Sequence, residues 1–259
     1  MGGDWTMTIY RRRTSYAVVA SGPTPLVSYN FDDSAAANGT SANGGTLANT
    51  GSGGSALNAA IQYCTWQTGY TGRALRYAPR IETSNTLTDR AFVAANSALN
   101  LTTGGTIMVR LKCSSSQLNE YGTFGLFDSS GNQVFTIWAN GTVTQITRMS
   151  YAVTTSGAGT ATNGIQLSTI SGFSGIQNWH HYAVTYTSGS FLLYVDGVQR
   201  ASRTDVTGNL SYAGNLRLDL GWISFGNQSP GYGWNGDVDD FRLYSTVLTQ
   251  AQIAAIASA

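Results

Sequence analysis

The chain has 259 residues, of which 42% are hydrophobic and only 10% are charged. That length and hydrophobic content suffice for a sizeable core, and an all-β sandwich of this size is usually one domain. The formal net charge of +1 gives no strong steering toward nucleic acid or anionic membrane, and no apolar stretch is long enough to span a bilayer. We therefore expect neither nucleic acid nor membrane as a partner.

The first 25 residues are predicted to be an N-terminal arm and linker, ahead of a single domain over residues 26–259. Ser21–Pro25 has the glycine and prolines typical of a linker. The apolar run after the three arginines is too short and too polar for an export signal, and the sequence keeps Met1, so we expect no processed signal. The arm has too much apolar surface for a solvated tail. We expect it to bind a protein partner in an oligomer or larger assembly, through Trp5, Tyr10, Arg11, Arg12, Arg13 and Tyr16.

Strand-like alternation recurs along the rest of the chain, with turn residues between the runs. Residues 34–57, which are almost entirely small or polar, are predicted to form a long polar loop. Asn140-Gly141 suits a type I′ hairpin turn because both positions tolerate positive φ. The predicted strands outside the region described next are 26–33, 74–78, 106–112, 123–127, 134–138, 142–147, 215–220 and 238–244.

The clearest pattern lies at residues 179–203. Three alternating runs are separated by Ser188-Gly189 and Asp196-Gly197, which predicts a three-stranded meander. One helix is predicted, at Thr249–Ala257, where Thr249 and Gln252 have the spacing of a capping box.

These segments resemble a known family. Gly175–Tyr186 is similar to its Trp-His-His-x-Ala-x-Thr-Tyr strand, Phe191–Gly197 to its Leu-Tyr-Val-Asp-Gly strand and turn, and Trp234–Tyr244 to its closing strand. Tyr29–Asp33 and Gly72–Tyr77 resemble its first two strands. The family is the laminin-G-like branch of the concanavalin A-like lectins and glucanases. The resemblance implies an all-β fold, a two-sheet antiparallel jelly-roll sandwich with one short C-terminal helix, but no single function.

The hydrolases of this family resemble one another in a Glu-x-Asp-x-x-Glu strand, and retaining hydrolysis needs two carboxyl groups about 5–5.5 Å apart. The chain has only two glutamates, Glu82 and Glu120, and neither stands in such a pattern. His180 and His181 are adjacent, so they point to opposite faces of a strand; we expect one to pack in the sandwich and the other to be solvated. We expect no enzyme activity and no zinc site.

An acidic cluster is predicted where the first strand pairs with the last. There the end of the first strand, with Asp32 and Asp33, meets the start of the strand at 238–244, with Asp239 and Asp240. Asp237 lies just before that strand and comes close as well. Carboxylates held together repel one another unless a cation or an arginine intervenes. Two alternatives stay open. One is a structural calcium ion, which prefers oxygen ligands and which the resemblance to calcium-stabilised family members supports. The other is that the carboxylates are solvated or pair with arginine. The candidate ligands are Asp32, Asp33, Asp239 and Asp240.

A glycine-rich stretch, Gly221–Gly236, carries Trp222, Tyr232 and Trp234. An aromatic ring can stack on a pyranose, so these three are the candidate glycan-binding residues; the alternative is that the tryptophans anchor a core or an interface. Cys64 and Cys113 are expected to be two buried thiols, although a disulfide stays open.

We interpret the chain as a non-catalytic interaction module. The first hypothesis is a phage or virion structural protein, such as a capsid decoration, fibre or tail component, which displays the lectin-like domain and attaches to capsid or fibre subunits through its arm. The alternative is a carbohydrate-binding or adhesion module of a bacterial surface or secreted protein.

Overall fold

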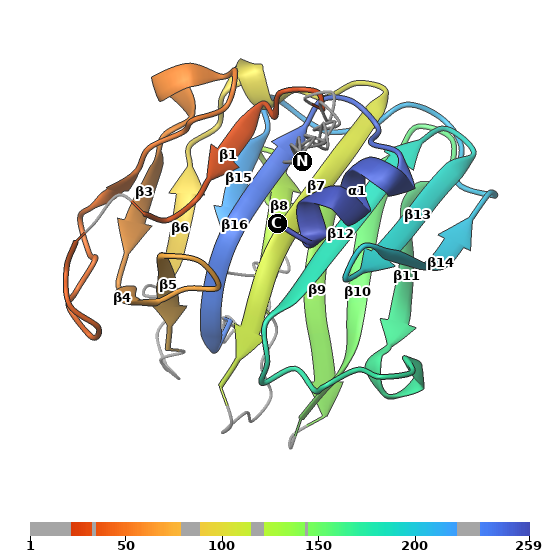
Figure 1. Cartoon of the computed structure of the whole chain (residues 1–259). Helices are drawn as coiled ribbons and strands as arrows, with labels where there is room; N and C mark the ends of the chain where they lie inside the picture. Colours follow the sequence, from red (N-terminus) through yellow and green to blue (C-terminus); the bar gives the residue numbers. More distant parts are fainter. Residues whose placement is uncertain (1–21, 33–34, 79–88, 115–121, 143–144, 222–233) are drawn as a thin grey trace, which may run out of the picture.

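The computed structural model describes residues 22–32, 35–78, 89–114, 122–142, 145–221 and 234–259. They form two antiparallel sheets packed face to face with one short helix on the outside, as Figure 1 shows, so the predicted all-β jelly-roll sandwich is confirmed. Among the described residues, no helix has the length and apolar character needed to cross a membrane.

Sheet A is the sheet at the front of Figure 1. Its strands run in the order β14-β13-β12-β7-β16-β5-β4, and β1 pairs with the end of β16. The bounds are β1 (Val27–Tyr29), β4 (Thr65–Thr68), β5 (Arg73–Tyr77), β7 (Gly104–Cys113), β12 (His180–Thr187), β13 (Ser190–Val195), β14 (Val198–Arg203) and β16 (Gly236–Tyr244).

Sheet B lies behind sheet A, and its order is β11-β10-β9-β8-β15-β6-β3-β2. The bounds are β2 (Thr46–Leu47), β3 (Ala59–Gln62), β6 (Arg90–Val93), β8 (Thr123–Phe127), β9 (Gln133–Thr142), β10 (Gln145–Thr155), β11 (Gly159–Gln166) and β15 (Arg217–Leu220). Among the described residues, three short 3-10 helices lie between strands: η1 (Gly54–Leu57), η2 (Ser97–Leu99) and η3 (Leu167–Thr169).

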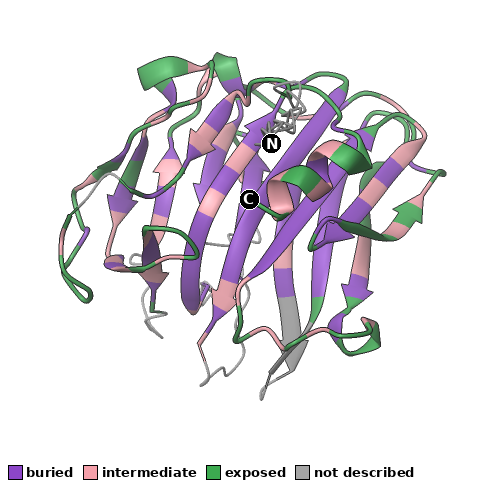
Figure 2. Cartoon of the chain, viewed as in Figure 1, coloured by how far each residue is buried: buried purple, intermediate pink, exposed green. Residues whose placement is uncertain are grey.

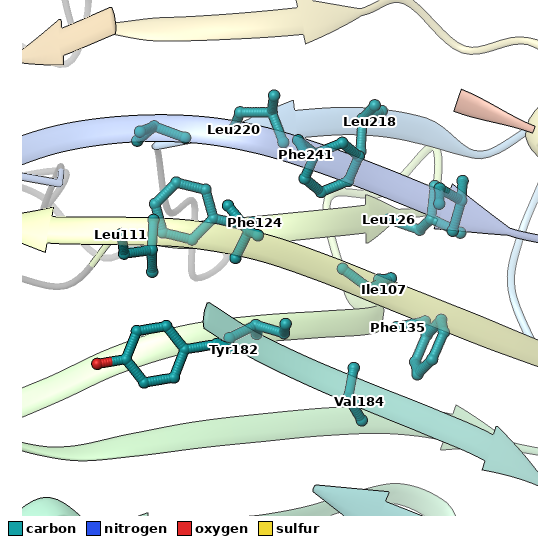
Figure 3. Close-up of a cluster of buried hydrophobic side chains, with 14 of the residues drawn as sticks. Ile107, Leu111, Phe124, Leu126, Phe135, Tyr182, Val184, Leu218, Leu220 and Phe241 are labelled. Carbon is teal, nitrogen blue, oxygen red and sulfur yellow. The ribbon is translucent and has the colours of Figure 1, made fainter. Parts of the chain in front are cut away.

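The core lies between the two sheets. Alternate residues of each strand point inward, so the apolar side chains of both sheets meet there. Figure 3 shows Ile107 of sheet A near Phe135 of sheet B, and Leu111 of sheet A near Phe124 of sheet B, all of them buried. Cys64 and Cys113 belong to this core as buried thiols and form no disulfide, as expected.

The helix α1 (Gln250–Ala257) covers part of the outer face of sheet A. The predicted capping box is present, with Thr249 and Gln252 each accepting a hydrogen bond from the other's backbone N–H. Ile253 and Leu248 pack on outward-facing Met108 and Tyr194, which form a second, smaller hydrophobic cluster. The opposite side of α1 stays exposed or half-buried in Figure 2.

The predicted meander is confirmed as β12, β13 and β14. Its second turn has Asp196 and Gly197 at φ values of 50° and 75°, the left-handed region that an Asp-Gly turn favours. A Cβ at Gly197 would lie 2.7 Å from the Cα of Ala254, so glycine also lets α1 approach this turn.

Two local predictions are wrong. Asn140-Gly141 is not a turn, because β9 continues to Thr142 and Gly141 pairs with Ile146 of β10. Residues 34–57 are not a loosely packed loop: the segment contains β2 and η1, and Leu47 and Leu57 are fully buried. Asn49 holds the segment in place, because its side-chain oxygen accepts the N–H of Ser28 at 2.8 Å.

Candidate functional site

The first and last strands pair as predicted. Val27 lies opposite Leu243 and Tyr29 opposite Phe241. This register carries the chain after β1 toward the middle of β16, where Asp239 and Asp240 lie. Asp33 lies outside the described residues.

The carboxylates there bind arginines and backbone N–H groups. Asp237 forms an ion pair with Arg76 through two hydrogen bonds. Asp240, which sits at a bulge with φ of 45°, accepts a hydrogen bond from Arg242 at 2.7 Å, and Arg110 lies 3.5 Å away on its other oxygen. Asp237 and Asp240 are therefore neutralised by arginine.

The turn between β4 and β5 lies between Asp32 and Asp239. Asp32 accepts the N–H of Arg73 at 2.8 Å, and Asp239 accepts that of Tyr70 at 2.9 Å. A Cβ at Gly72 would lie 2.0 Å from an oxygen of Asp32, so a side chain there would displace this contact. The two acids attach the turn to the sheet.

Asp239 is 1% exposed, and burial raises its pKa to about 7, although three hydrogen bonds from backbone N–H groups oppose the rise. Arg110 lies opposite Asp239 in the sheet and stacks over the ring of Tyr70 at 3.8 Å. The guanidinium of Arg110 also donates to the carbonyl oxygens of Ile256 and Ala257, at the end of α1. A small pocket of about 160 Å³ lies over this group.

These residues do not match the donor set that calcium prefers. Calcium takes six to eight oxygen ligands. Here Arg110 and Arg242 supply the positive charge beside Asp240, and the oxygens of Asp239 accept three N–H groups. In the part of the chain that the structure describes, no group of three or more potential metal ligands is placed to hold an ion. The contacts match the arginine-paired alternative, and calcium binding stays a prediction.

Both histidines of β12 are buried, so the expectation that one is solvated is wrong. His180 lies 2.7 Å from Asp196 and stacks on Phe173 at 4.1 Å. His181 points to the outer face, but Arg110 and the end of α1 lie beside it there, and it is 1% exposed. Burial, with a further contribution from Arg110, lowers the pKa of His181 to about 3, and neither ring nitrogen hydrogen-bonds any described residue.

Of the three candidate aromatic residues, Trp222 and Tyr232 lie outside the described residues. Trp234 is 3% exposed and packs edge-on against Phe124 in the core, with ring centroids 5.8 Å apart. Its indole has no open face for a sugar, so the core alternative holds for this residue. The arm residues Trp5, Tyr10, Arg11, Arg12, Arg13 and Tyr16 also lie outside the described part of the chain.

The outer face of sheet B carries a second group of polar and aromatic side chains. Asp219 accepts a hydrogen bond from Arg217 at 2.7 Å, and Arg90 lies 3.7 Å away. Arg90 stacks over the ring of Phe92 at 4.1 Å, and Arg217 lies 5.4 Å from the ring centre of Phe127. We call this group, with half-buried Trp138 of β9, the arginine–aromatic strip.

Asp219 is the carboxylate that pairs with both arginines of the strip. It is fully buried, and burial raises its pKa even though Arg217 and Arg90 oppose the rise. The two arginine side chains are about a quarter exposed, 27% for Arg217 and 26% for Arg90, although the Nη2 atom of Arg217 is buried. The carboxylate therefore orients two planar, partly exposed donor groups.

Two more polar side chains lie on the same face. Thr123 pairs with Trp138 in the β8–β9 register, and Gln133 pairs with Phe127. The hydroxyl of Thr123 and the amide nitrogen of Gln133 are buried, and neither hydrogen-bonds any residue in the described ranges. A buried donor that lacks a partner costs about 1–3 kcal/mol, so both groups favour a hydrogen-bonding partner.

A family model described as the concanavalin A-like lectin/glucanases superfamily matches residues 83–254, more than half of the chain. The chain belongs to this superfamily. The predicted resemblance is confirmed. No curated protein sequence matches the chain.

Several solved structures are similar to this chain in fold. The receptor-binding domain of botulinum neurotoxin mosaic serotype C/D aligns with a TM-score of 0.59 at 13% identity, covering 91% of this chain and 50% of that chain. The binding domain of botulinum neurotoxin DC, solved with rat synaptotagmin II, gives 0.59 at 12%, with 91% and 51% covered. Domain 4 of AbnA, a GH43 extracellular arabinanase from Geobacillus stearothermophilus, solved with arabinotriose, gives 0.58 at 15%, with 90% and 98% covered.

The chain thus spans about half the length of the toxin domains and almost all of the arabinanase domain. At these identities the likeness shows the fold: a lectin-like jelly-roll sandwich. The arginine–aromatic strip of this superfamily member was missed from the sequence, because Arg90 and Asp219 are far apart in the chain and meet only through the β6–β15 pairing.

Proposed function

We propose that the chain is a non-catalytic carbohydrate-binding module of a surface or secreted protein, and that it binds sugar on the outer face of sheet B. The observation that carries the proposal is the arginine–aromatic strip, where Asp219 pairs with two partly exposed arginine side chains beside aromatic rings. The buried hydroxyl of Thr123 and the buried amide nitrogen of Gln133, which hydrogen-bond no described residue, lie on the same face.

This combination suits the chemistry of a sugar. A pyranose or furanose offers hydroxyl groups around its edge and C–H groups on its faces. Planar guanidinium groups are rigid forks of N–H donors, and hydroxyl oxygens can accept from them. Aromatic side chains such as Trp138 and Phe92 supply apolar surface with a fixed geometry for the C–H faces. Specific small-ligand sites in general combine apolar walls with a few placed polar groups.

The solved relatives support this choice over the virion hypothesis. The arabinanase domain is named with a bound arabinotriose and belongs to an extracellular enzyme, and it corresponds to almost the whole of this chain. One toxin domain is named as a receptor-binding domain, and another is named as a binding domain in complex with rat synaptotagmin II. None of these names a capsid, fibre or tail protein, so the surface or secreted alternative is the one we propose.

The test is a glycan array followed by affinity measurements on the glycans that bind. Trp138→Ala and Arg90→Ala should each weaken binding about tenfold or more, which is a loss of ~1.4 kcal/mol per tenfold. The matched control is Arg203→Ala, which removes an arginine of β14 paired with exposed Asp205. The proposal is wrong if no glycan binds, or if the control weakens binding as much as the strip variants do.

A further inference from the structure

A groove of about 690 Å³ runs along α1 on the outer face of sheet A. One wall is the exposed side of α1, where Ala251 and Ala255 follow each other at a spacing of one helical turn. Leu248 and the segment Gly22–Pro25 also line the groove. The lining is mostly apolar, and its size falls in the range of a ligand or peptide site.

The groove borders the point where the described chain begins. Gly22 is itself one of the lining residues. The residues just before it, Tyr16-Ala17-Val18-Val19-Ala20, form an almost wholly apolar run. An extended chain covers at most ~3.6 Å per residue, so this run can reach no farther than ~22 Å from Gly22.

We propose that residues 16–20 bind in the groove of their own chain. The short tether through Ser21 gives the run an effective concentration on the order of millimolar at the groove, without any new partner. Docking would bury Val18 and Val19 against Ala251, Ala255 and Leu248, at ~25 cal/mol for each Å² of apolar surface removed from water.

This docking accounts for the two exposed alanines of α1. Ala251 and Ala255 are exposed and carry no charge, whereas a solvent-facing helix side usually carries charged or polar residues. A covering segment of small apolar residues fits such a surface.

Engineered cysteines test the docking directly. Val18→Cys combined with Ala255→Cys should form an intramolecular disulfide in dilute protein under mild oxidation, located by peptide mass mapping. The matched control is Val18→Cys with Ala60→Cys, since Ala60 is exposed on β3 in sheet B, away from α1 (Figure 1). A disulfide-linked dimer, or crosslinking as fast in the control pair, would overturn the proposal.

A second measurement uses chymotrypsin cleavage after Tyr16 in the full chain. Ala251→Glu with Ala255→Glu places two charges on the groove wall, and glutamate keeps the helix because it is a good helix former. Cleavage after Tyr16 should become about tenfold faster than in the parent, the ratio that ~1.4 kcal/mol of lost docking gives. Ala251→Ser with Ala255→Ser is the control. Equal cleavage in the parent and the Glu variant would contradict the docking.

Discussion

Replacing Asp239 with asparagine should change how the stability of the fold depends on pH. In the folded chain burial raises the pKa of Asp239 from 3.8 to about 7. Between these two values the folded state holds a proton that the unfolded state has released. Asp239 therefore contributes stability that is fully present below pH 3.8 and is lost as the pH rises through 7, up to ~4 kcal/mol at 1.36 kcal/mol per pH unit.

His181 acts in the opposite direction. Burial lowers its pKa from 6.5 to about 3. Between these two pH values the imidazole is protonated in the unfolded state and neutral in the folded state. Stability that is fully present above pH 6.5 is lost as the pH falls through 3, up to ~5 kcal/mol on the same scale. In the shared window, from about pH 4 to 6.5, the two contributions oppose each other and leave the parent protein with a shallow slope.

Asp239→Asn removes only the first contribution. The free energy of unfolding of this variant should rise by about 3 kcal/mol more than that of the parent between pH 4 and 6.5. His181→Leu should show the reverse slope. The assay is urea denaturation at half-unit pH steps, read by circular dichroism. Parallel curves for the parent and Asp239→Asn would refute the reasoning that burial of Asp239 holds its proton.

Three further predictions concern stability. Asp237→Ala should lower the free energy of unfolding by about 1–3 kcal/mol in thermal denaturation, because it leaves the guanidinium of Arg76 without its carboxylate; no change would show that the pair is solvated. Thr249→Ala removes the capping box of α1 and should cost about 1 kcal/mol, whereas Thr249→Ser should cost little. If calcium binds at some of Asp32, Asp33, Asp239 and Asp240, a hundredfold excess over its Kd should add ~2.7 kcal/mol, and an equal Tm in EDTA and in millimolar calcium would remove that prediction.

The sequence predicted the features that depend on neighbouring residues. The meander β12–β14 follows from alternation and from turns at Gly189 and Gly197, and the cap of α1 follows from Thr249 and Gln252. The pairing of β1 with β16 was also predicted and is confirmed.

Features that depend on distant contacts were not predicted. Asn140-Gly141 has the composition of a turn, yet pairing with β10 keeps it in the strand and moves the hairpin end beyond Thr142. His181 was expected in solvent or in the sandwich by alternation alone, and only Arg110 and the end of α1 bury its outward ring. Asp219 and Arg90 meet through strand order, which no local pattern contains.

The sugar-binding face is tested most directly by hydrogen–deuterium exchange with and without a bound glycan identified on the array. If the arginine–aromatic strip holds the sugar, backbone exchange should slow in β6, β8, β9 and β15, and peptides from β12–β14 and α1 should exchange as before. Protection confined to α1 and β16, with none in the strands of sheet B, would contradict the account.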